Sequence, residues 1–124
     1  MAIPEDAFVI AYSMDPEDIV DFTINMTDFT DAIFQDGEVV DTFSLVVGAE
    51  GAALGVTLGT GSYLAAKVNA DTGIRFWPMV DSGYWDDPAW DDSGTLIPIE
   101  ATMSTNSSPP RQFQRTLVIR TKQL

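Results

Sequence analysis

The feature that most constrains this chain is the alternation of apolar and polar side chains over residues 94–121. Apolar residues recur with period two in both halves, at Ile97, Ile99, Ala101 and Met103 in the first and at Phe113, Leu117 and Ile119 in the second, where Arg115 is the exception. A period of two is typical of a strand with one buried face. Segment 105–110 between them holds polar turn formers and two prolines, which cannot donate to a ladder. Residues 94–121 are therefore predicted to form one long antiparallel hairpin.

An isolated hairpin is marginal in water, so earlier strands must cover its apolar face. Alternation or short apolar runs predict further strands at 7–12, 19–26, 39–47, 54–58, 63–69 and 74–80. One helical turn is expected at 29–33, where Phe29, Ala32 and Ile33 recur at one-turn spacing. The fold class this predicts is all-β, an antiparallel immunoglobulin-like β-sandwich of about seven strands. A small barrel is the competing architecture.

A chain of 124 residues has room for one core, so we expect residues 16–124 to form a single domain. Residues 1–15 are expected to be an arm or an edge strand.

The glycine-rich stretch 49–61 lacks the Lys-Ser/Thr of a nucleotide-binding loop, and its glycines instead suggest bulges or close backbone contacts. The first six residues lack the charged and apolar segments of a signal peptide, and no run is long enough to span a bilayer.

Composition narrows the chemistry. The chain has neither cysteine nor histidine, which removes disulfides, thiolate chemistry, the commonest transition-metal ligand and the usual general base. A formal net charge of -13 argues against nucleic-acid binding, because phosphates need a basic face. We therefore expect no enzyme activity and no cofactor.

The charge is distributed unevenly along the chain. Twelve acidic residues and no basic ones lie in the first fifty positions, whereas four of the six basic residues lie in the last fourteen, namely Arg111, Arg115, Arg120 and Lys122. These basic residues either face a neighbouring acidic copy or lie beside acidic strands of their own fold.

The most conspicuous loop is 81–94, with three large aromatic residues and five aspartates. Several interpretations compete. Asp86, Asp87, Asp91 and Asp92 are candidate calcium ligands, although their spacing does not match a twelve-residue calcium loop. The aromatic and acidic residues also suit sugar binding or glycoside hydrolysis. Alternatively, Trp85 and Trp90 close the end of the sandwich or, with Tyr84, dock on a partner protein while the aspartates stay solvated.

Three segments carry a resemblance to a known family. An aspartate-rich strand at 14–25, a strand after an acidic turn at 36–47, and a closing hairpin from Thr102 to a basic last strand ending at Arg120 occur in this order. This layout resembles the small immunoglobulin-like virion proteins of tailed bacteriophages. The chain departs from that pattern in its final loop, where residues 106–110 replace a glycine-containing turn, and in the 81–94 loop.

The resemblance implies a non-enzymatic structural protein of the virion, assembled in the host cytoplasm. A capsid decoration or cement protein is the first expectation, and a neck or tail connector or a fibre-like protein is the alternative. The implied partners are the major capsid protein, other virion proteins and further copies of the chain. The surfaces expected to contact them are the basic last strand and the 81–94 loop. A calcium- or carbohydrate-binding module is the alternative of another class.

Overall fold

The computed structural model describes residues 3–5, 7–10, 13–28 and 34–124, which form a small, mostly β domain with three sheets and one short α-helix. The largest sheet has the order β1-β9-β8-β3, with β1 Phe8–Val9, β9 Gln112–Thr121, β8 Thr95–Thr105 and β3 Val40–Val47. The second has the order β2-β6-β5, with β2 Phe22–Asn25, β6 Gly73–Phe76 and β5 Ala66–Val68. The third pairs β4 Val56–Leu58 with β7 Pro78–Val80.

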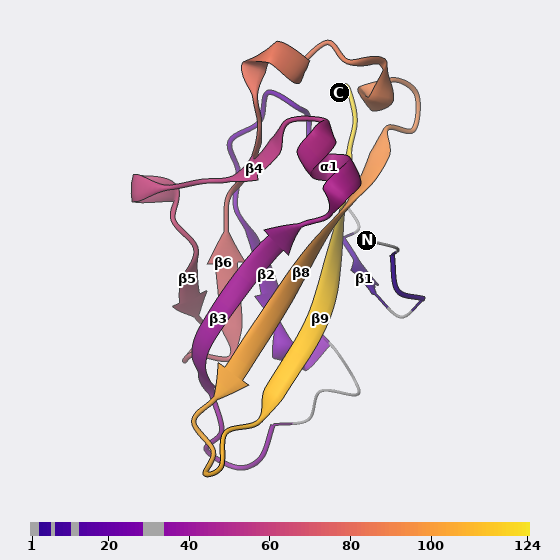
Figure 1. Cartoon of the computed structure of the whole chain (residues 1–124). Helices are drawn as coiled ribbons and strands as arrows, with labels where there is room; N and C mark the ends of the chain where they lie inside the picture. Colours follow the sequence, from indigo (N-terminus) through magenta and orange to yellow (C-terminus); the bar gives the residue numbers. More distant parts are fainter. Residues whose placement is uncertain (1–2, 6, 11–12, 29–33) are drawn as a thin grey trace.

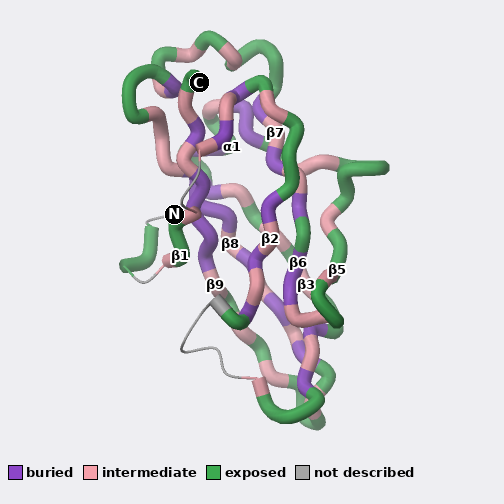
Figure 2. The backbone as a smooth tube through the Cα atoms, turned by 180° about the vertical axis from the view of Figure 1, so that it is seen from behind, coloured by how far each residue is buried: buried purple, intermediate pink, exposed green. Residues whose placement is uncertain are grey.

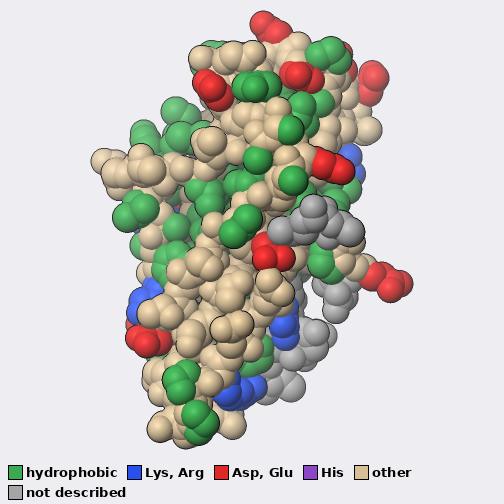
Figure 3. Space-filling model, in the orientation of Figure 1, with side chains coloured by type: hydrophobic (Ala, Val, Ile, Leu, Met, Phe, Trp, Pro, Cys, Tyr) green, Lys and Arg blue, Asp and Glu red, His purple; other side chains and the backbone are tan. Residues whose placement is uncertain are grey.

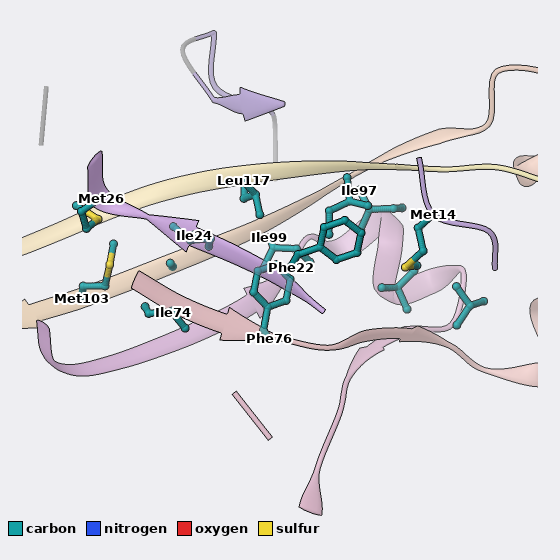
Figure 4. Packing of buried hydrophobic residues seen from close by; sticks show 14 of the residues in the cluster. Met14, Phe22, Ile24, Met26, Ile74, Phe76, Ile97, Ile99, Met103 and Leu117 are labelled. Carbon is teal, nitrogen blue, oxygen red and sulfur yellow. The ribbon is translucent and has the colours of Figure 1, made fainter. Parts of the chain in front are cut away.

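The two larger sheets form two layers with the core between them. Figure 1 shows β3, β8 and β9 in front of β5, β6 and β2. In Figure 4, Phe22, Ile24, Ile74 and Phe76 from the rear layer meet side chains of the hairpin. The buried segments in Figure 2 lie along the strands, and the loops at both ends are largely exposed. Alternation therefore places one face of each sheet in a shared core.

The predicted hairpin is confirmed. Strands β8 and β9 pair antiparallel from Thr95 with Thr121 to Ser104 with Gln112. The first predicted apolar set is fully buried, as are Leu117 and Ile119, whereas Phe113 is half-buried. The chain reverses between the two strands, at the segment with the two prolines.

Pro98 lies inside β8, where a missing donor would ordinarily break a ladder. Pro98 C=O accepts from Gly48 N–H at 2.9 Å, so the backbone groups of Pro98 face the end of β3. The ladder between β3 and β8 stops there, and the proline is tolerated because no ladder hydrogen bond needs its missing N–H. A Cβ on Gly48 would lie 2.7 Å from Pro98 Cγ, so this contact requires glycine.

Several predicted elements differ in the structure. Part of the glycine-rich stretch is helix α1, Ala49–Ala53, because Gly51 lets the helix lie against Ile97 of β8, and a strand follows only at 56–58. The strand predicted at 63–69 shortens to β5 after a 3-10 turn, η2 Gly61–Tyr63, and Leu64 is 63% exposed. The strand predicted at 74–80 divides into β6 and β7, which join different sheets.

The described part of the amino-terminal segment contains one short strand. Strand β1 is an edge strand that pairs parallel with β9 of its own chain, with Phe8 opposite Leu117. Strand β2 begins at Phe22 and leads into a 3-10 turn, η1 Met26–Asp28, whereas the preceding Val20 is exposed. The helical turn predicted at 29–33 lies outside the described residues.

The strand count is higher than predicted. The described residues form nine strands rather than about seven, and none of their sheets closes into a barrel. In the same part of the chain, no helix combines the length and the apolar character that a membrane span needs.

Candidate functional site

The 81–94 loop lies at one end of the two layers, beside the carboxyl-terminal residues (Figure 1). It contains two 3-10 turns, η3 Ser82–Tyr84 and η4 Pro88–Trp90. The loop is tied to the segment after the last strand, since Trp90 C=O accepts from Gln123 N–H at 2.8 Å and Trp85 C=O accepts from Gln123 Nε2 at 2.7 Å. A side chain on Gly94, which has a φ of +71°, would collide with the backbone of Thr121. The loop is therefore a fixed part of the domain end.

Trp90 anchors the loop from beneath. Its side chain is fully buried in the core, and its indole Nε1 donates to Tyr84 C=O at 2.7 Å. A buried indole usually has such a partner, because an unpaired N–H is costly. The Trp90 side chain therefore fills the end of the core, and its ring is not exposed to solvent.

Tyr84 and Trp85 lie nearer the surface. Trp85 is half-buried against the core and donates from Nε1 to Val80 C=O at 2.9 Å. Tyr84 is 38% exposed, and its ring lies on Gly55, where any side chain would overlap it. Both rings are thus held from one side and presented to solvent on the other. Little side-chain freedom therefore remains in either ring.

The loop aspartates surround these rings. Asp87 caps η4 by accepting from Ala89 N–H at 2.9 Å, whereas Asp86, Asp91 and Asp92 are exposed. Figure 3 shows acidic side chains gathered at this end of the molecule. Within the described residues, no three acidic side chains lie close enough to share one ion. The loop therefore presents most of its carboxylates to solvent.

The four basic residues in the last fourteen positions do not form one patch. Arg120 lies beside the 81–94 loop and donates from Nη1 to Ser93 C=O at 2.7 Å, and Lys122 follows it along the chain. Arg111 and Arg115 lie toward the opposite end, with their guanidinium carbons 4.9 and 5.4 Å from the centre of the Phe113 ring. Only Arg120 and Lys122 are thus near the predicted contact loop.

Sequence reasoning missed a buried polar cluster around Glu38. This carboxylate accepts from Gln35 N–H at 2.8 Å, Thr105 Oγ1 at 2.5 Å and Arg111 Nη1 at 2.9 Å. The side chain of Glu38 is only 2% exposed, and that of Arg111 is 36% exposed. No sequence signal could have found the cluster, because Arg111 lies 73 positions from Glu38. The cluster holds the hairpin turn against the turn that precedes β3.

The environment of Glu38 has two opposing effects on its pKa. Burial raises the pKa by penalising the charged form, whereas hydrogen bonds from Thr105 and Gln35 and the charge of Arg111 lower it. The lowering effects prevail, and the pKa of Glu38 lies below its ordinary value. Glu38 is therefore an ionised structural group. The hollow beside it, of about 330 Å³, is open and polar.

Comparison with protein-family models, with curated proteins and with solved structures finds no match to this chain.

Proposed function

We propose that this chain is an immunoglobulin-like domain. The strand order supports this assignment. Immunoglobulin domains place strands C, F and G in one sheet and B, E and D in the other. In chain order, β2, β3, β5, β6, β8 and β9 correspond to B, C, D, E, F and G, and the observed orders β3-β8-β9 and β2-β6-β5 then match. The disulfide of antibody domains is absent, and here packing of the two layers replaces it.

The function we propose is that of a non-enzymatic structural protein of a bacteriophage virion, specifically a capsid decoration protein. The observation that carries it is the 81–94 loop, where buried Trp90 and half-buried Trp85 hold an exposed Tyr84 ring at one end of the domain. Rigid aromatic residues at a surface are typical of protein interfaces. The exposed carboxylates around Tyr84 suit a partner surface with basic residues.

Co-sedimentation tests this proposal. The chain is mixed with emptied, undecorated capsids of the phage that encodes it, and bound protein is measured after centrifugation. We expect saturable enrichment on the particles and an increased resistance of the particles to heat. A chain that never enriches on capsids is not a decoration protein. Enrichment on purified tails or necks instead would assign the alternative role of connector or fibre-like protein.

A pair of tyrosines provides a matched control. Tyr84 and Tyr63 are 38% and 39% exposed, but only Tyr84 belongs to the 81–94 loop. Tyr84→Ser is expected to weaken capsid binding by roughly tenfold or more, the size of an interface hot spot. Tyr63→Ser should leave binding unchanged. Melting temperatures of both variants show that the effect is not a loss of folding.

A further inference from the structure

Strand β3 is an unusually long free edge. It closes the four-stranded sheet on the side opposite β1, and in Figure 1 it runs along the border of the front layer. It has 8 residues, whereas the outer strands β1, β2 and β5 have 2, 4 and 3. Proteins usually keep edge strands short or protect them, because their unpaired backbone groups attract other strands. The length of β3 therefore needs a reason.

The direction of the backbone groups of β3 follows from its register with β8. Gly48 N–H donates to Pro98 C=O, so Gly48 faces β8. Hydrogen-bonded residues alternate along an antiparallel strand, so the backbone groups of Ser44 and Val46 face β8, and those of Phe43, Leu45 and Val47 point outward. In the described part of the chain, no hydrogen bond satisfies these outward groups.

The beginning of the same edge is protected. Val40 N–H donates to Asp71 C=O at 2.8 Å, and Lys67 Nζ donates to the carbonyls of Val40 and Asp41 at 3.3 and 3.2 Å. The register also shifts between Val40 and Thr42, which bends the strand there. A lysine and a bulge are two common means of protecting an edge. They cover the first residues of β3 and leave 42–48 open.

The open stretch also differs chemically from the rest of the surface. Residues 42–48 contain no charged side chain, although 20% of the whole chain is charged. On the outer face Val46 is 52% exposed, and on the inner face Phe43, Leu45 and Val47 are only partly buried against the core. A strand added at this edge would thus gain backbone hydrogen bonds and cover apolar side chains.

We propose that β3 pairs with β3 of a second copy of this chain, antiparallel and centred near Leu45. An edge of this kind is self-complementary about a two-fold axis, since each outward residue offers one donor and one acceptor to the same residues of the other copy. Two copies that each carry a charge of -13 repel each other elsewhere, and the uncharged stretch lets them approach. The two four-stranded sheets become one continuous sheet. This inference concerns the free protein and does not depend on capsid binding.

Sedimentation velocity over a range of salt concentrations tests the pairing. From about 0.01 M to about 1 M salt the Debye length falls from about 30 Å to about 3 Å, so repulsion between copies weakens and the dimer fraction should rise. Amides provide a second readout, because those of Phe43, Leu45 and Val47 should become protected from hydrogen exchange as the dimer forms. Those of Ser44 and Val46 are protected by β8 from the start.

The diagnostic variant is Val46→Lys. Val46 is exposed and lies opposite Glu100 on β8, so a lysine there leaves the monomer folded. The pairing centred near Leu45 sets Val46 opposite Ser44 of the other copy, so the two lysines lie diagonally across the two-fold axis on the same face, and the dimer Kd should rise by roughly fivefold. The control is Ser82→Lys, which makes the same charge change at an exposed position of η3 and should leave the dimer intact.

Three outcomes would overturn the proposal. A wild-type chain that stays monomeric at every salt concentration has no such pairing. A dimer that Val46→Lys does not weaken uses another surface. A dimer that is lost only when residues 1–10 are removed is held by β1, not β3.

Discussion

At the scale of single residues, Glu38 shows how one buried carboxylate ties distant segments together. Its three partners come from the turn before β3, the last residue of β8 and the residue before β9. Burying a charge is unfavourable unless it is hydrogen-bonded and paired, and Glu38 meets both conditions. The cluster therefore makes folding of the hairpin turn dependent on the ionisation of one group.

This arrangement predicts a pH dependence of stability. The pKa of Glu38 is lowered in the folded state, so its contribution is fully present above the unfolded-state pKa of about 4.3 and is lost as the pH falls through the lower folded-state pKa. In Glu38→Gln that contribution is absent at every pH. We expect the wild-type free energy of unfolding to exceed that of the variant at pH 7 and the gap to narrow below about pH 4. Urea denaturation at several pH values measures the gap, and a constant gap would contradict this role.

A second residue-scale prediction concerns Gly48. The Cβ of an alanine there would lie 2.7 Å from the rigid Pro98 ring. The structure could make room for this Cβ only by a shift of β3 or β8. We expect Gly48→Ala to destabilise the fold by about 1–3 kcal/mol, a typical cost of overpacking. Gly83→Ala is the control, since no atom lies within 4 Å of a Cβ built there. Equal stabilities of the two variants would show that the Pro98 contact is unimportant.

At the scale of elements, the 81–94 loop behaves as a small folded unit around Trp90. Trp90→Phe keeps most of the buried ring but removes the indole donor to the carbonyl of Tyr84, which still accepts from Asp87 N–H at 3.1 Å. We expect a loss of about 0.5–1.5 kcal/mol for Trp90→Phe, the net value of one hydrogen bond, and of about 3–5 kcal/mol for Trp90→Ala, which leaves a cavity. Asp91→Asn, at an exposed position, should change little. Guanidinium denaturation gives the three values, and a neutral Trp90→Ala would mean that the loop is not anchored from within.

How far the elements could be predicted depends on what determines each of them. The hairpin was predictable because its alternation extends over many residues and both arms bury the same face. Helix α1 was missed because its position depends on Gly51 fitting against Ile97, a contact between separate elements that no local pattern records. The division of 74–80 into two strands likewise depends on which sheets were available for pairing.

The candidate site, like the fold, was predictable from the sequence only in part. The density of aromatic and acidic residues was enough to identify the 81–94 loop as a candidate binding surface. Only the structure separates buried Trp90 from exposed Tyr84, since both are large aromatic residues in a loop of turn formers. The basic residues of the last strand looked like one group in sequence. A strand of ten residues separates them into two ends, because each residue advances the chain by about 3.3 Å.

At the scale of the whole molecule, charge is the dominant feature. With 19 acidic and 6 basic side chains, repulsion within one copy outweighs the few ion pairs seen among the described residues. We expect the melting temperature to rise as salt is added, because screening reduces this repulsion more than it weakens ion pairs. Differential scanning calorimetry of Val46→Lys at low protein concentration separates this effect from dimer formation. A melting temperature that falls with salt would show that ion pairs dominate.

The parallel contact between the first and last strands has a mechanical consequence. Ile10 and Met14 N–H donate to the carbonyls of Val118 and Arg120, and Met14 C=O accepts from Lys122 N–H. Because these strands run in the same direction, a force that pulls residue 8 and residue 122 apart loads the bonds together in shear instead of opening them one by one. The domain is thus built to resist tension along its own chain.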